Sequence, residues 1–311
     1  MLAYGKFALL LVYNYTAGYH DYFGGDPMAK VAIVTDSTTY LPKELTKGYE
    51  IHIVPSLVIW GGEQLRDGFD IQPAEFYKRL SGAKEMPSTS QPSPAAFKET
   101  YEDLISKGFK DILSVHISEK LSRTIASAEL AKDLVTGANI EIVDGRSASM
   151  GTGWPLMEAA KAAKAGSSLK ECAEIFKKAG QHAGVILMVD TLEFLHRGGR
   201  IGGAARFLGT ALNLKPILEI RDGALEPIER VRTKGKAIER MVELAEEKIA
   251  GRSPVYLAVL HANVAEDAKA LLAQASKRMK PVETALADVS PAVGTHTGPG
   301  TLGIAFMAGY K

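Results

Sequence analysis

The sequence predicts a two-lobed α/β protein, with a parallel sheet in an N-terminal α/β domain and a mixed sheet in a C-terminal α/β domain. The chain has 311 residues, which is long for one core and favours about two domains. In the first half, short apolar runs alternate with amphipathic helical patterns, as is typical of parallel strands covered on both faces. In the second half, Asp222-Gly223 separates two apolar runs and indicates an antiparallel hairpin.

The N-terminal domain is expected over residues 30–166, and Ser93-Pro94 marks the start of one of its helices. We expect its strands at 31–35, 51–54, 57–60, 111–117 and 140–143, and its helices at 94–106, 122–134 and 150–165.

The C-terminal domain is expected over residues 167–311, with a ligand between the two domains. We expect its helices at 168–179, 191–197, 204–213, 234–250 and 265–278, and its strands at 184–189, 216–220, 224–231, 255–260, 282–288 and 302–307. Residues 1–29 are interpreted as a poorly structured extension, because their apolar run is short; a weak secretory signal is the alternative.

Composition excludes several classes of protein. The net charge is +1 and no basic run occurs, which argues against nucleic acid as a partner. No apolar stretch reaches the length of about 20 residues that a transmembrane helix needs, so a cytoplasmic protein without integral membrane association is expected. The single cysteine, Cys172, excludes a disulfide framework and a cysteine-rich zinc site, and no motif predicts a metal or a nucleotide cofactor.

Four segments rich in hydroxyl groups and glycine follow predicted strands, where α/β proteins place ligands: 36–39, 88–94, 118–124 and 294–300. Helix capping explains some of these hydroxyls, such as Ser93, and is an alternative for Ser122. Helix capping does not explain Thr89. His296 lies in a glycine-rich loop, which is not the sequence context of a buried core histidine. These segments therefore predict a site for a small acid held by hydroxyl groups.

Taken together, these segments resemble the DegV family of bacterial fatty-acid-binding proteins from about residue 30 to residue 311. The resemblance is carried by Val34-Thr-Asp-Ser-Thr38, Thr89-Ser-Gln-Pro-Ser93, Leu121-Ser122 with Thr124, Val143-Asp144 with Ser147-Ala-Ser-Met-Gly151, Gly198-Gly-Arg-Ile201, Leu214-Lys-Pro-Ile-Leu218, Val231-Arg-Thr233 and Gly294-Thr-His-Thr-Gly-Pro-Gly300.

The resemblance implies a fatty acid buried between the lobes, with its carboxylate held by Thr89 and Ser122 and with His296 nearby. The remaining expected ligand contacts are Ser90, Thr124 and Thr295. The resemblance also implies a partner, a fatty acid kinase, which phosphorylates the carboxylate and so feeds phospholipid synthesis. Arg200 and Arg232 are the candidates for contact with that partner or with the transferred phosphoryl group. Intrinsic catalysis is not expected.

One departure from the family lies beside the expected carboxylate site, where Arg123 replaces the usual glycine. Two other functions remain open. The first is a small acyl or phosphoester hydrolase that uses Ser122 and His296, with Asp36 or Asp144 completing a triad. The second is a regulatory protein that senses lipid and binds another protein through the loop 197–200.

Overall fold

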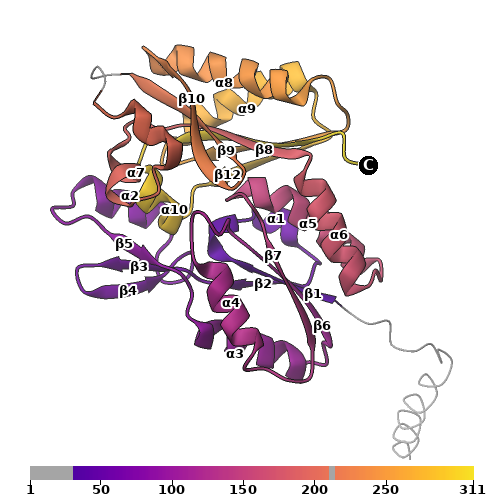
Figure 1. The fold of residues 1–311 in the computed structure, drawn as a ribbon. Coiled ribbons are helices and arrows are strands. Elements are labelled where there is room, and N and C mark those ends of the chain that lie inside the picture. Colours follow the sequence, from indigo (N-terminus) through magenta and orange to yellow (C-terminus); the bar gives the residue numbers. More distant parts are fainter. Residues whose placement is uncertain (1–30, 210–213) are drawn as a thin grey trace, which may run out of the picture.

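The computed structural model describes residues 31–209 and 214–311. The predictions for residues 1–29 and for the end of the helix expected at 204–213 lie outside the described residues. Figure 1 shows two lobes, with the earlier part of the chain in one and the C-terminal part in the other. The predicted α/β class, with one parallel and one mixed sheet, is confirmed.

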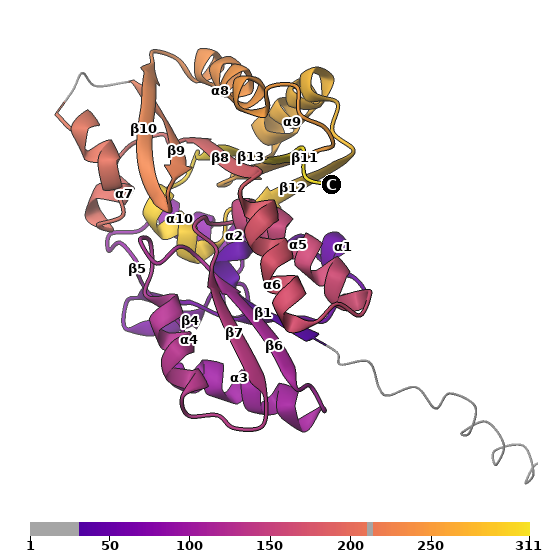
Figure 2. The ribbon, with the colours of Figure 1, turned by 45° about the vertical axis from the view of Figure 1, so that its right-hand side comes forward.

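The first lobe is built on a four-stranded sheet in the order β2-β1-β6-β7, and all its pairs are parallel. Its strands are β1 (Val31–Asp36), β2 (Ile51–Val54), β6 (Asp111–His116) and β7 (Asn139–Asp144). Every residue of β1 is buried, which explains why its sequence is a continuous apolar run and not an alternating one. Helices α3 (Pro94–Ser106) and α4 (Thr124–Lys132) pack together beside the sheet, as Figure 2 shows.

The same lobe carries a small antiparallel sheet in the order β4-β3-β5. Its strands are β3 (Leu57–Trp60), β4 (Glu63–Arg66) and β5 (Ser88–Ser90). The prediction that segment 88–94 is a loop is therefore wrong for its first residues, because Ser88–Ser90 forms a strand that pairs with β3. A Ser-Thr-Ser segment has no apolar alternation, so its strand structure depends on the open edge of β3. Helices α1 (Lys43–Thr46) and α2 (Pro73–Ser81) complete the lobe.

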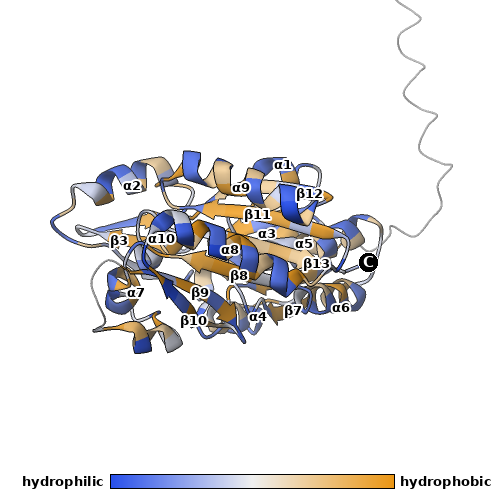
Figure 3. Cartoon of the chain, turned by 90° about the horizontal axis from the view of Figure 1, so that it is seen from above, coloured by the Kyte–Doolittle hydropathy of each residue, from blue (hydrophilic) through white to orange (hydrophobic). Residues whose placement is uncertain are grey.

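The second lobe is built on a six-stranded mixed sheet in the order β10-β9-β8-β13-β11-β12. Its strands are β8 (Ala183–Met188), β9 (Lys215–Arg221), β10 (Ala224–Val231), β11 (Val255–His261), β12 (Glu283–Asp288) and β13 (Leu302–Ala308). The β9–β10 hairpin confirms the Asp-Gly prediction, since Asp222 and Gly223 both have positive φ, as a two-residue turn of this kind requires. Helices α8 (Lys234–Ile249) and α9 (Ala265–Met279) pack on one face of this sheet (Figure 3).

The largest hydrophobic cluster spans the two lobes, and each lobe also has a cluster of its own. Helix α5 (Met150–Lys164) contacts β1 of the parallel sheet and β8, β11 and β13 of the mixed sheet, and α6 (Leu169–Gly180) packs against α5. The largest apolar cluster accordingly runs from Val31 to Met307. Within the part of the chain that the structure describes, no helix is both long enough and apolar enough to cross a membrane.

Helix α10 (Pro291–Thr297) follows β12 in the second lobe but packs against η1 (Ser37–Thr39), α2, β3 and β5 of the first lobe. The glycine-rich loop expected at 294–300 is therefore helical up to Thr297. Ser290 caps this helix by accepting a hydrogen bond from the backbone N–H of Val293, with Pro291 next to it. The α-helix expected at 204–213 is wrong over the part that the structure describes, because the chain after α7 (Glu193–Arg197) forms the short 3-10 helix η2 (Gly202–Phe207), and Leu208 is extended.

Candidate ligand-binding site

A cavity lies between the lobes, where the carboxyl edge of the parallel sheet meets one face of the mixed sheet. Buried aliphatic side chains of the second lobe form much of its wall: Val185, Leu187, Leu195, Leu225 and Leu260. Most hydroxyl, amide and imidazole groups of the lining come from the first lobe and from α10, and Thr301 adds one from the segment before β13: Thr38, Ser56, Thr89, Ser90, Gln91, Ser122, Ser149, His296, Thr297 and Thr301. A mostly apolar cavity with polar groups on part of its lining suits an amphiphilic small molecule.

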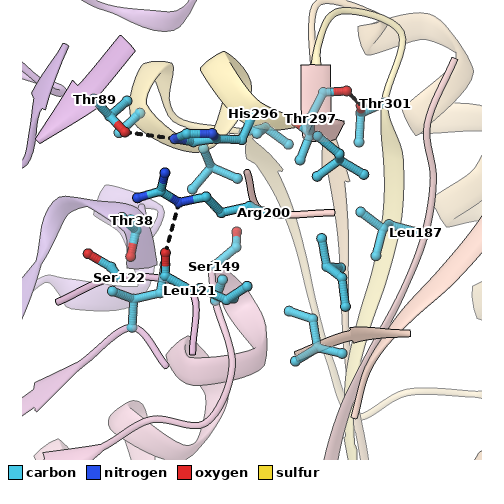
Figure 4. A pocket seen from close by; sticks show the side chains of 18 of the residues that line it. Thr38, Thr89, Leu121, Ser122, Ser149, Leu187, Arg200, His296, Thr297 and Thr301 are labelled. Carbon is cyan, nitrogen blue, oxygen red and sulfur yellow. Dashed lines mark hydrogen bonds between the residues drawn. The ribbon is translucent and has the colours of Figure 1, made fainter. Parts of the chain in front are cut away.

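Thr89 and His296 meet at the polar side of the cavity. The Thr89 Oγ1 lies 2.7 Å from the His296 Nε2, although the two residues are 207 positions apart. The β3–β5 pairing places Thr89 opposite Val58, and α10 packs on both strands and carries His296 toward them. Figure 4 shows this hydrogen bond above the cavity. The contact therefore depends on the antiparallel sheet of one lobe and a helix of the other.

His296 is held as a neutral imidazole. Burial, reinforced by the positive charge of Arg200, lowers the pKa of His296 from its ordinary 6.5 to about 4. Its Nδ1 is buried and has no hydrogen-bond partner among the described residues. A Cβ atom at position 198 would lie 2.0 Å from this Nδ1, so Gly198 is required for the ring to occupy its place. The imidazole can hydrogen-bond a carboxylate, but it does not bring a positive charge to it near neutral pH.

Arg200 supplies the positive charge at this site. Its Nε donates to the carbonyl of Leu121 at 3.2 Å, and its Nη1 donates to the carbonyl of Gly198 at 2.6 Å. The first of these bonds crosses from one lobe to the other, and the side chain lines the cavity. Figure 4 shows the guanidinium group below His296 and bonded to the carbonyl of Leu121. A half-buried guanidinium group in this position favours an anionic ligand.

Ser122 lines the cavity and does not cap a helix. Helix α4 begins at Thr124, its N-cap residue is Arg123, and that residue makes no side-chain capping bond. The Ser122 Oγ lies 2.8 Å from the Thr124 Oγ1, and Thr124 is fully buried behind it, outside the cavity lining. The capping explanation of Ser122 is therefore wrong. Arg123 itself is exposed.

Of the other expected ligand contacts, some line the cavity and some lie outside it. Ser90 lines the cavity. Thr295 is buried outside the lining, and its hydroxyl donates to the carbonyl of Pro291 at 2.9 Å. Arg232 is exposed and lies outside the lining. The proposed ligand-binding roles of all these residues stay predictions.

Three cavity-lining hydroxyls lie outside the four segments singled out from the sequence: Ser56, Ser149 and Thr301. Ser149 lies within one of the resemblance motifs, but its sequence neighbourhood reads as the start of a helix and predicts no ligand contact. The one signal that distinguishes it is conformational, a φ of 51° at a residue that is not glycine, and this value is visible only in the structure.

The residues of the alternative hydrolytic triad bond elsewhere. Ser122 pairs with Thr124 and His296 pairs with Thr89, so the hydroxyl and the imidazole do not form a nucleophile–base pair. Asp36 accepts hydrogen bonds from His116 and from the backbone N–H of Ile117. Asp144 accepts from the backbone N–H of Arg146. These contacts give no support to the hydrolase interpretation.

The fold defines a two-lobed α/β protein with a mostly apolar cavity between its lobes. Residues 30–309 match a family described as "Uncharacterised protein, DegV family". Protein DegV of Bacillus subtilis is 34% identical over 279 residues, which cover 88% of this chain and 98% of that protein. A DegV domain-containing protein of Streptomyces coelicolor is 36% identical over 275 residues, covering 88% of this chain and 97% of the other. The chain therefore belongs to the DegV family.

Solved structures agree with this assignment. A DegV family protein of Thermus thermophilus, described as fatty acid binding, superposes with a TM-score of 0.84 at 35% identity, over 90% of this chain and 99% of the other. DegV of Bacillus subtilis, described as a fatty acid binding protein, superposes with a TM-score of 0.83 at 32% identity, again over 90% and 99% of the two chains.

Proposed function

We propose that this protein binds a long-chain fatty acid between its lobes, with the hydrocarbon chain along the mixed sheet and the carboxylate near Thr89, Ser122 and His296. The observation that carries the proposal is the cavity itself, whose aliphatic wall faces a set of hydroxyl, imidazole and guanidinium groups. The two similar solved proteins described as fatty acid binding support it.

The physical chemistry of the two ends favours such a ligand. Each buried methylene contributes about 0.8 kcal/mol, so a long alkyl chain supplies most of the affinity. A carboxylate loses its water on entering the site and needs several donors in return. Thr89, Ser122 and the imidazole of His296 supply hydrogen bonds, while Arg200 supplies the compensating charge.

We further propose that the protein presents this carboxylate to a partner kinase. The kinase transfers the γ-phosphoryl group of ATP to a carboxylate oxygen, and the acyl phosphate then enters phospholipid synthesis in the cytoplasm. Thr89, Ser122 and Arg200 are half-buried, whereas the aliphatic wall is buried, so the polar end is the accessible one. In this proposal Arg200 and the exposed Arg232 contact the kinase or the transferred phosphoryl group.

Lipid binding is tested by extracting the purified protein with organic solvent and identifying released acids by mass spectrometry. The delipidated protein is then titrated with palmitic acid by calorimetry. We expect an endogenous long-chain acid and saturable binding at one site per chain. Delipidated, folded protein that binds no long-chain acid contradicts the proposal.

Presentation to a kinase is tested with palmitate-loaded protein, a bacterial fatty acid kinase and ATP, with hydroxylamine present to trap palmitoyl phosphate as its hydroxamate. We expect hydroxamate with the loaded protein and little with free palmitate at the same concentration. Equal yields from free and bound palmitate would remove the carrier role while leaving lipid binding intact.

A further inference from the structure

Ser149 has an unusual backbone conformation at the edge of the cavity. Its φ is 51° and its ψ is −141°, directly before the first residue of α5. Residues other than glycine avoid this region, and such strain persists where the surrounding structure holds it, often at ligand sites. Here the backbone N–H of Ser149 donates to the carbonyl of Thr38 at 3.2 Å, which ties the strained residue to the loop after β1.

The hydroxyl of Ser149 is buried and unused. The residue is 5% exposed and lines the cavity, and its Oγ has no hydrogen-bond partner within residues 31–209 and 214–311. It does not cap α5, since no side-chain capping bond forms at this helix start. Figure 4 shows the hydroxyl directed into the cavity, toward the side chain of Arg200. Buried hydroxyls normally have a hydrogen-bond partner. An unpaired one on a cavity wall therefore indicates that a ligand provides the partner.

The position of Ser149 on its helix favours an anion. Ser149 stands at the N-terminus of α5, a helix of 15 residues, where the partial positive charge of the helix dipole lies. Thr297 provides a contrast, because its hydroxyl is also buried, unpaired in the described chain and on the cavity lining. However, Thr297 is the last residue of α10, at the negative end of a helix dipole.

Three other polar groups of the site, those of Thr89, Ser122 and Arg200, already have partners. Thr89 is bonded to His296, Ser122 is bonded to Thr124, and Arg200 donates to two carbonyl oxygens. Each of these groups therefore already uses part of its hydrogen-bonding capacity within the protein. Ser149 can donate its hydroxyl proton without breaking any bond of the described structure.

We propose that Ser149 is a further anchor for the carboxylate, donating its hydroxyl to a carboxylate oxygen at the N-terminus of α5. This inference rests on the proposed fatty acid binding and adds a residue to it. The strained backbone holds the hydroxyl in the cavity, and the helix dipole and Arg200 make its surroundings favourable to negative charge.

The test compares palmitate with methyl palmitate, which has the same acyl chain and an uncharged head. Calorimetric titrations use wild-type protein, Ser149→Ala, and Thr297→Val as the matched control that loses the other unpaired hydroxyl. A hydrogen bond to a charged group is stronger than one to a neutral group. We expect Ser149→Ala to lower palmitate affinity about tenfold or more and methyl palmitate affinity less than about threefold. Thr297→Val should leave palmitate affinity within about threefold of wild type.

A second variant separates the hydroxyl from the backbone strain. Ser149→Gly removes both, so its thermal midpoint should equal or exceed that of Ser149→Ala while its loss of palmitate affinity is the same. Equal losses for palmitate and methyl palmitate, or equal losses in Ser149→Ala and Thr297→Val, overturn the assignment of Ser149. Failure of the folded wild-type protein to bind palmitate would instead overturn the proposed function, and this inference with it.

Discussion

Two clusters of buried polar side chains, each around a histidine, differ in how completely their hydrogen bonds are made. Around His116, Asp36 lies 3.3 Å from one ring nitrogen and Ser114 lies 2.7 Å from the other. Ser114 in turn bonds to the hydroxyl of Tyr101 at 2.8 Å. Around the cavity, by contrast, the His296 Nδ1 and the Ser149 Oγ have no partner in the part of the chain that the structure describes.

The difference separates a structural network from a binding site. The His116 cluster is closed, is packed against Phe97, and ties the end of β1 to the end of β6. An unpaired buried polar group costs about 1–3 kcal/mol, so a folded protein retains such groups where a ligand or water completes them. Changes in the closed cluster should therefore lower stability, and changes at the cavity should lower affinity.

The largest expected effect is on stability, from Asp36→Ala. Burial alone raises the pKa of Asp36. Hydrogen bonds from His116, Thr38 and the backbone N–H of Ile117 nevertheless hold this pKa below its ordinary value. Removing this carboxylate leaves these donors unpaired in the core, and we expect the unfolding free energy to fall by about 3–5 kcal/mol. Urea denaturation measures the change.

Asp70→Ala is the control for this prediction, because Asp70 pairs with Arg66 on the surface. An exposed ion pair contributes about 1 kcal/mol or less. If Asp36→Ala and Asp70→Ala lose the same stability, the His116 cluster does not have the structural role assigned to it.

A second effect on stability concerns pH and Asp67, which joins the two lobes by accepting hydrogen bonds from Ser37 and from the backbone N–H of Ala292. Burial raises the pKa of Asp67 to about 7 in spite of these bonds. Between pH 4 and pH 7 the folded protein therefore binds a proton that the unfolded chain has released. This proton contributes stability that is present below about pH 4 and is lost as the pH rises through 7.

We expect the contribution of Asp67 to fall by about 4 kcal/mol over this range, because each unit of a pKa shift corresponds to about 1.4 kcal/mol. Asp67→Asn keeps an uncharged acceptor for Ala292 and has no proton to lose. Urea denaturation of both proteins at a series of pH values should show the stability of wild type declining relative to Asp67→Asn as the pH rises. A constant difference between the two would show that Asp67 has an ordinary pKa.

The smallest effect in energy is on affinity, where the two histidines are compared directly. We expect His296→Ala to lower palmitate affinity about tenfold, as for the loss of one hydrogen bond from a neutral donor to a carboxylate. His116→Ala should lower the thermal midpoint more than His296→Ala does, with palmitate affinity unchanged at a temperature where it remains folded. Calorimetric titration and thermal denaturation give both quantities. Equal affinity losses would indicate that the distinction between the two clusters is wrong.

Local sequence patterns determined much of the fold. Apolar runs placed the strands of both main sheets, Ser93-Pro94 marked the start of α3, and Asp222-Gly223 marked the hairpin. These features depend on a few neighbouring residues, whose conformational preferences act before any distant contact forms. Motifs also pointed to Thr89, Ser122 and His296, all of which line one cavity.

Only the tertiary structure decided how these residues are used. Ser88–Ser90 becomes a strand because β3 offers it an edge, and α10 carries His296 across to the other lobe, 207 positions from Thr89 in the chain. The unpaired hydroxyl of Ser149 depends on a strained φ and on the absence of any neighbour within bonding distance in the described structure. Such features arise from the packing of whole elements against one another, which local patterns along the chain do not encode.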